Sequence, residues 1–187
     1  MELKGKTVLF LGSSVTFGSA AGGVSFADIM AETLELKMIK AAVSGTTLAD
    51  IEENSYVSRL KKIDTESKVD LFICQLSTND AGRNIPIEKT EQAIRFIIEY
   101  VKKSFGCPIV FYTGTYFENE HYGKLVKLLV SLREEYGFHL LNLWEDTEML
   151  SVSEADYKKY MADPIHPTLL GYREWWTPKF IRFCSLI

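Results

Sequence analysis

The segment Thr7–Gly18, TVLFLGSSVTFG, joins an apolar run directly to a turn rich in serine, threonine and glycine. Four more apolar runs follow along the chain, beginning at Met38, Asp70, Pro108 and His139. All five runs are nearly continuous in valine, isoleucine, leucine and phenylalanine, a pattern typical of strands buried on both faces of a parallel sheet. Thr7–Gly18 therefore predicts a buried strand that ends in a polar turn before a helix.

Segments with helical periodicity separate the apolar runs. One face of 26–34 is apolar, and Ser25 with Asp28 has the spacing of a capping box at its start. A second helix is expected to begin after Pro86, and a third is expected to end at Gly137. This alternation of strands and helices predicts an α/β fold with a parallel sheet.

The last helical segment is expected to start near Thr168 and to break near Pro178, because proline lacks the N–H that an interior helical position needs. Within it, the neighbouring Trp175 and Trp176 are expected either in the core or at an interface. The sequence shows no repeat, low-complexity stretch or linker, so residues 1–187 are expected to form a single domain.

The composition excludes several classes of partner. The 187 residues carry a net charge of −4 with scattered lysine and arginine, so no nucleic-acid partner is expected. No apolar stretch is long enough to span a bilayer and no secretion signal is visible, so a cytoplasmic location without a membrane partner is expected.

Neither a metal nor a cofactor is expected, because no metal-ligand spacing is present. The cysteines are too widely spaced for a disulfide framework and stand at Cys74, Cys107 and Cys184.

Polar residues stand directly after three of the predicted strands, and a fourth polar group stands near the C-terminus. Because the carboxyl ends of parallel strands meet at one edge of the sheet, these distant groups are expected to gather there. The four groups are Gly12–Gly18 after the first strand, Gly45 after the second, Asn79 after the third, and the sequence DPIHP that contains Asp163 and His166.

These residue types suit acyl transfer. A serine hydroxyl becomes a nucleophile when an adjacent imidazole accepts its proton, and a carboxylate on the other ring nitrogen holds the imidazole in place. Asp163 and His166 are three residues apart, so Asp163 can reach the near ring nitrogen while the far nitrogen faces Ser14. The backbone N–H groups of Ser14 and Gly45 and the side-chain amide of Asn79 are suited to binding an oxyanion.

Serine, glycine, asparagine and histidine follow one another in the order of the motif blocks of the SGNH/GDSL hydrolase superfamily, and 12–172 resembles that superfamily. The resemblance implies a three-layer α/β/α sandwich with a flavodoxin-like five-stranded parallel sheet. It implies that Ser14 is the nucleophile, that His166 is the general base and that Asp163 orients His166. The oxyanion hole would be formed by Ser14, Gly45 and Asn79.

Two positions depart from the usual pattern of the superfamily. Ser13 stands where the first block usually has aspartate, and Ser77 stands where the third block usually has glycine. Neither position belongs to the implied triad, so the chemistry can survive both changes. Ser13 is also the rival nucleophile, and Ser14 is preferred because of its place in the resembling block.

The resemblance implies a carboxylic ester hydrolase that acts on a small-molecule ester through an acyl-serine intermediate. Short loops around 17–24, 81–87 and 114–122, with 144–162 as a wall or lid, favour a short-chain acyl group, such as acetyl on a carbohydrate or a small alcohol. Three alternatives remain open. They are an acyltransferase with the same triad, a non-catalytic binding module of the same fold, and a flavodoxin-like phosphate or flavin binder that uses the serine-rich turn.

Overall fold

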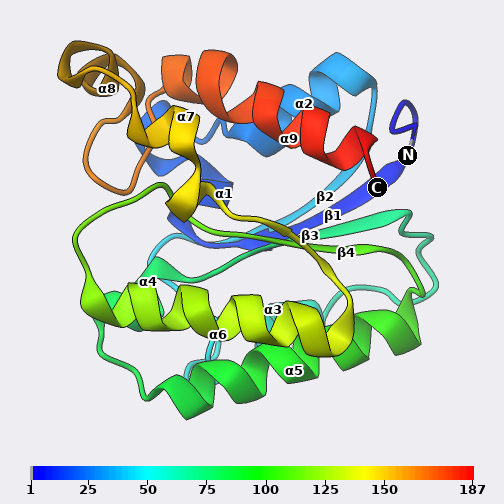
Figure 1. Cartoon of the computed structure of the whole chain (residues 1–187). Coiled ribbons are helices and arrows are strands. Elements are labelled where there is room, and N and C mark those ends of the chain that lie inside the picture. The colour runs from blue at the N-terminus through cyan, green and yellow to red at the C-terminus, as the bar shows by residue number, and fades with distance from the viewer. Residues whose placement is uncertain (1) are drawn as a thin grey trace.

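The computed structural model describes residues 2–187 and contains a sheet of five parallel strands between two layers of helices (Figure 1). The strand order is β2-β1-β3-β4-β5, and the direction of winding reverses between β1 and β3. This arrangement confirms the predicted three-layer α/β/α sandwich with a flavodoxin-like sheet. The strands are β1 (Thr7–Gly12), β2 (Lys37–Ala42), β3 (Leu71–Gln75), β4 (Ile109–Tyr112) and β5 (His139–Leu141).

The sheet separates two hydrophobic cores, because successive side chains of a strand point to opposite faces. In β1, Phe10 joins one core and Leu9 joins the other, and both side chains are fully buried. The layer at the top of Figure 1 contains α2 (Phe26–Leu34), α7 (Thr147–Leu150) and α9 (Thr177–Ser185). The layer at the bottom contains α3 (Tyr56–Leu60), α5 (Ile87–Ser104) and α6 (Glu120–Tyr136).

Strand β2 differs from the prediction that every strand is buried on both faces. Lys37 is exposed and the other residues of β2 are half-buried, because β2 lies at the edge of the sheet and pairs only with β1. The ammonium group of Lys40 donates to the Asp28 carboxylate over 2.5 Å and to the backbone carbonyls of Phe17 and Gly23. Lys40 thus connects β2 to the segment from Phe17 to the start of α2.

The predicted helix termini are confirmed. Ser25 and Asp28 form a capping box at the start of α2, in which the Asp28 carboxylate accepts the Ser25 N–H over 2.7 Å. Helix α5 begins at Ile87, directly after Pro86. Gly137 ends α6 with a φ of 70°, a conformation that glycine adopts without steric cost.

The C-terminal helix is continuous where the sequence predicted a break near Pro178. Its turn η3 (Gly171–Trp176) has π-helical geometry and passes directly into α9, with the Thr177 N–H bonded to the carbonyl five residues earlier. The wider turn accommodates a proline that has no N–H to donate. Trp175 and Trp176 both lie in the core, with exposed fractions of 8% and 0%.

The stretch 144–162, which was expected to form a wall or lid, consists largely of short helices. No helix of residues 2–187 combines the length and the hydropathy that a membrane span requires. The remaining helical elements are α1 (Ser14–Phe17), η1 (Ser19–Ala21), α4 (Thr78–Gly82), η2 (Leu143–Glu145) and α8 (Glu154–Tyr160).

Candidate active site

The polar groups predicted to gather at one edge of the sheet follow three neighbouring strands. Ser14 opens α1 directly after β1, Gly45 lies in the loop after β2, and Asn79 lies in α4 after β3. Since β2, β1 and β3 are adjacent and parallel, their carboxyl ends lie side by side. The folding of the sheet therefore places these three residues on the same edge.

A hydrogen-bonded relay joins Ser14 to two residues from the far end of the chain. The Oγ atom of Ser14 lies 2.7 Å from Nε2 of His166, although 152 positions separate them in sequence. The other ring nitrogen of His166, Nδ1, lies 2.7 Å from Oδ2 of Asp163. With a carboxylate facing Nδ1, the neutral ring carries its proton there, and Nε2 is left to accept the hydroxyl proton of Ser14.

The carboxylate of Asp163 is fixed by its own short loop. Its Oδ1 atom accepts the backbone N–H groups of Ile165 and His166, each over 2.8 Å, while Oδ2 faces the imidazole. Burial opposes the ionisation of Asp163, but the hydrogen bonds from Ile165 and His166 outweigh it, so the pKa lies below its usual value. The carboxylate is therefore ionised at neutral pH and is oriented toward the ring.

The three groups expected to bind an oxyanion occupy positions with defined geometry. The N–H of Ser14 is in the first turn of α1, where amides lack an acceptor within the helix. Gly45 has a φ of 78°, and its carbonyl accepts a 2.5 Å hydrogen bond from Arg83. The side-chain amide of Asn79 donates to the carbonyl of Thr46 over 2.8 Å, so the third strand end is tied to the second.

The model of the GDSL-like lipase/acylhydrolase family matches residues 10–174, which is nearly the whole chain. The chain belongs to this family. No match emerged by sequence among curated proteins. A Lactobacillus plantarum protein is similar in structure to this GDSL-like chain, with a TM-score of 0.84 and 19% identity over 98% of each chain.

Two further solved structures resemble the GDSL-like chain. A member of the lipolytic G-D-S-L family from Veillonella parvula has a TM-score of 0.76 and 14% identity, and the match covers 97% of this chain and 100% of the other. An acetylxylan esterase from Geobacillus stearothermophilus has a TM-score of 0.75 and 16% identity, covering 97% of this chain and 95% of the other. At these identities the likeness concerns the fold.

The side chain of Gln75, the last residue of β3, forms hydrogen bonds to the turn that carries Ser14. The Oε1 atom of Gln75 accepts the backbone N–H of Ser13 and the hydroxyl of Thr16, each over 2.9 Å. Gly12 is required because a Cβ atom there would lie 1.7 Å from the Thr16 oxygen. Gln75 was missed in the sequence, where the only signal was one polar residue at the end of an apolar run.

Ser13, which replaces the aspartate usual in this GDSL-like family, lies in an environment different from that of Ser14. It is fully buried, and its hydroxyl faces the side chain of Gln75 at 3.5 Å. Of the two serines, Ser14 is the one whose hydroxyl contacts His166. The geometry thus separates the two adjacent serines, which the sequence distinguishes only by resemblance.

Asp80 connects the loops after β2 and β3. Its carboxylate accepts the backbone N–H groups of Leu48 and Ala49 over 2.8 and 2.9 Å, and the hydroxyl of Thr90 over 2.9 Å. These amides belong to the loop after β2, because the sheet brings that loop next to the loop after β3. Ser77 caps α4, because its hydroxyl oxygen accepts the backbone N–H of Asp80 over 3.2 Å.

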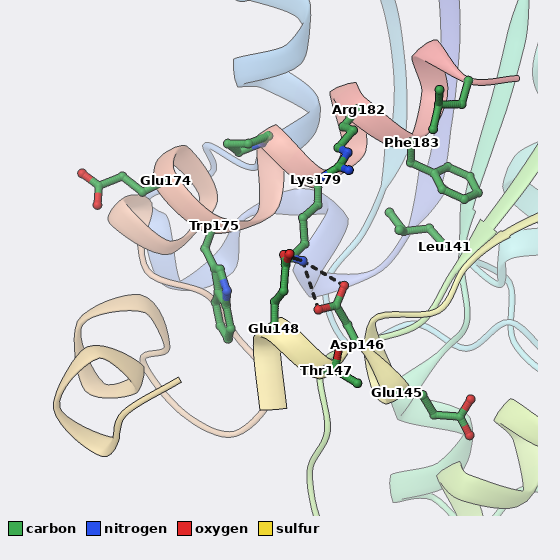
Figure 2. A pocket seen from close by; sticks show the side chains of 12 residues that line it. Leu141, Glu145, Asp146, Thr147, Glu148, Glu174, Trp175, Lys179, Arg182 and Phe183 are labelled. Atoms are coloured by element: carbon green, nitrogen blue, oxygen red, sulfur yellow. Dashed lines mark hydrogen bonds and ion pairs between the residues drawn. The ribbon is translucent and has the colours of Figure 1, made fainter. Parts of the chain in front are cut away.

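Two cavities adjoin α7. One of about 280 Å³ lies between the loop after β4 and helices α7 and α8. The other, of about 620 Å³, lies between α7 and α9 (Figure 2), and contains the ion pairs of Lys179 with Asp146 (2.9 Å) and Glu148 (2.6 Å). Trp175 lines both cavities, and neither is lined by Ser14 or His166.

Proposed function

We propose that this GDSL-like acylhydrolase is a serine esterase in which Ser14 is the nucleophile, His166 the general base and Asp163 the residue that orients the imidazole. The observation that carries the proposal is the continuous relay from Ser14 Oγ through both nitrogens of His166 to the Asp163 carboxylate, with 2.7 Å at each step. Such a relay activates a hydroxyl that is otherwise a weak nucleophile at neutral pH.

The proposed reaction has two steps. Ser14 Oγ attacks the ester carbonyl while its proton passes to His166 Nε2, and the tetrahedral intermediate collapses as His166 returns that proton to the leaving alcohol. Water then attacks the acyl-serine bond by the same route and releases the carboxylic acid. The N–H groups of Ser14 and Gly45, with the amide of Asn79, are proposed to bind the negative oxygen in both steps.

The serine assignment is tested with p-nitrophenyl acetate and two adjacent substitutions. Ser14→Ala is expected to lower kcat by a factor of at least about 10³, because the nucleophile is lost. Ser13→Ala is the matched control and is expected to stay within about tenfold of the unmodified protein, because the Ser13 hydroxyl contacts no member of the relay. Equal activity of the unmodified and Ser14→Ala proteins would contradict the proposal.

The 280 Å³ cavity supports a small ester substrate. Its walls include Thr115, Tyr116, Met149, Leu150, Tyr157 and Trp175. Burial and, after it, the charge of Asp163 raise the pKa of Tyr157 in this wall. His166 must protonate the leaving alcohol, so the alcohol belongs on the Asp163–His166 side. The volume lies just below the roughly 300 Å³ at which pockets for drug-sized ligands begin.

We therefore propose that the leaving alcohol is small, such as a single sugar ring, and we further propose that the acyl group is short, such as acetyl. The acetylxylan esterase of the same fold motivates the acetyl-sugar choice. A series of p-nitrophenyl esters from acetate to palmitate is expected to give kcat/KM values that fall as the acyl chain lengthens. A maximum at octanoate or longer would exclude the short-chain assignment while leaving the serine mechanism intact.

A further inference from the structure

Arg59 lies beneath the edge of the sheet that carries the proposed site. Its side chain extends from α3 and only 8% of the residue is exposed. One terminal nitrogen, Nη2, donates to the Gly12 carbonyl over 2.9 Å and to the Thr46 hydroxyl over 3.0 Å. The other, Nη1, donates to the Ala41 carbonyl, and Nε donates to the Asn54 carbonyl over 3.0 Å.

The guanidinium is a buried cation whose partners are all neutral. In the part of the chain that the structure describes, no carboxylate lies within ion-pair distance of Arg59. The ring of Tyr56 stacks near it at 5.0 Å, and burial raises the pKa values of Tyr56 and of the nearby Cys74 thiol, so neither is an anion. Burial lowers the pKa of Arg59, whereas the charge of Glu52, which lies beyond ion-pair distance, acts in the opposite direction. A guanidinium stays protonated in proteins.

Two of the groups that Arg59 contacts, the Gly12 carbonyl and the Thr46 hydroxyl, belong to segments that carry proposed oxyanion donors. The Gly12 carbonyl directly precedes the turn of Ser13 and Ser14. Thr46 follows Gly45, and its carbonyl accepts the side-chain amide of Asn79. A single rigid guanidinium therefore joins the end of β1 to the loop after β2, and through Thr46 it reaches the end of β3.

We propose that Arg59 is a positioning residue for ester hydrolysis, which sets the spacing of the oxyanion donors and adds a buried positive charge beneath the site where negative charge develops. This inference rests on the proposed esterase function. Preorganised dipoles and charges that face a developing oxyanion stabilise the transition state more than the bound ester, because the ester oxygen carries little charge. The effect is stronger in a buried environment, where water does not screen the charge.

The test compares Arg59→Met with Arg59→Lys in steady-state hydrolysis of p-nitrophenyl acetate. Arg59→Met is expected to lower kcat by about 10²-fold with little change in KM, because transition-state stabilisation is lost and ester binding is kept. Arg59→Lys keeps the charge but loses the forked geometry, and it is expected to recover part of kcat. A purely structural role would lower the melting temperature without this split between kcat and KM.

A second readout follows the reaction of Ser14 with a fluorophosphonate by mass spectrometry. The hydroxyl proton of Ser14 passes to His166 as Ser14 Oγ bonds to phosphorus and fluoride leaves. The phosphoryl oxygen takes the position proposed for the oxyanion. Arg59→Met is expected to slow this labelling. Thr46→Val removes one acceptor of Arg59 while leaving the cation in place, and it is expected to slow labelling to a smaller degree.

Arg95→Met is the matched control, because Arg95 forms ion pairs with Glu91 and Glu135 on the outer helices α5 and α6. Its labelling rate is expected to equal that of the unmodified protein. Unchanged labelling in folded Arg59→Met would overturn the role of Arg59 and leave the esterase proposal standing. If Arg59→Met does not fold, unchanged labelling in both Arg59→Lys and Thr46→Val would overturn it. Failure of the unmodified protein to label would overturn the esterase proposal and this inference with it.

Discussion

At the scale of single residues, the site depends on which hydrogen-bond partner each polar atom finds. Ser13 and Ser14 are chemically identical neighbours, yet one faces Gln75 and the other faces His166. Asp163 shows the same principle, because the two oxygen atoms of its carboxylate have different hydrogen-bond partners. One accepts two backbone N–H groups and fixes the loop, and the other faces the imidazole. Removing the charge should therefore disturb both the loop and the ring.

Asp163→Asn is expected to lower kcat for p-nitrophenyl acetate by roughly 10²- to 10⁴-fold. An amide group can donate to Nδ1, which moves the ring proton to Nε2 and leaves no acceptor for the Ser14 hydroxyl. Comparing kcat of the variant with that of the unmodified protein at several pH values measures the effect. Retention of full activity would show that another group orients the imidazole.

The same substitution tests the lowered pKa of Asp163 through stability. A carboxyl whose pKa is lower in the folded state stabilises the protein fully above its unfolded pKa of about 4. The contribution is lost as the pH falls through the lower pKa of the folded state. The difference in melting temperature between the unmodified protein and Asp163→Asn should therefore narrow below about pH 4. A difference that widens in acid would contradict the assigned direction.

At the scale of secondary structure, the helical turn η3 positions the loop that carries Asp163 and His166. Gly171 packs against the end of α8, where a Cβ atom would lie 1.9 Å from the Tyr160 carbonyl oxygen. The Tyr160 carbonyl also accepts the Thr168 N–H over 2.9 Å, which closes the loop. Close contact between these helices is therefore a condition for the geometry of the relay.

Gly171→Ala is expected to destabilise the protein by about 1–3 kcal/mol, because the clashing atoms belong to the backbone and cannot rotate away. The displaced loop should also slow the fluorophosphonate labelling of Ser14. Gly123→Ala in α6 is the matched control, since its nearest neighbour would be a Trp144 ring carbon at an ordinary 3.9 Å. Alanine in that helix should stabilise the protein by up to about 1 kcal/mol. Equal urea midpoints for the two variants would refute the proposed clash.

At the scale of the whole molecule, the layer of α2 and α9 is joined to the sheet by a cluster of aromatic rings around Phe26. The Phe26 ring stacks on Phe180 of α9 at 3.8 Å and meets Tyr112 of β4 edge-on at 5.2 Å. Tyr172 connects this core to the site, because its hydroxyl donates to the Val15 carbonyl over 2.7 Å. The core and the nucleophile turn are thus packed as one unit.

Phe26→Ala is expected to lower the free energy of unfolding by about 3–5 kcal/mol, because the ring is fully buried and its removal leaves a cavity. Phe96→Ala is the comparison, since Phe96 is half-buried on α5 and should cost distinctly less. Urea unfolding followed by circular dichroism measures both values. A loss of less than about 1 kcal/mol for Phe26→Ala would show that the surrounding rings close the cavity.

The sequence by itself determined the fold class and most element boundaries, because these depend on local patterns. Apolar runs marked all five strands, and Ser25 and Gly137 marked helix termini at the predicted positions. The family also followed from the sequence, since its motif blocks survive in order. The triad and oxyanion assignments came from that resemblance and stay proposals, although the close contacts of Ser14 with His166 support them.

Tertiary structure alone decided which polar groups meet across the sheet edge. Arg59 and Gln75 look ordinary in sequence, and they gained their roles when strands from distant segments brought their acceptors and donors together. The partial exposure of β2 and the unbroken helix at Pro178 were mispredicted for the same reason. The position of β2 in the strand order determines how much of it is buried. The π-helical turn before Pro178 accommodates the proline through contacts that the local sequence does not encode.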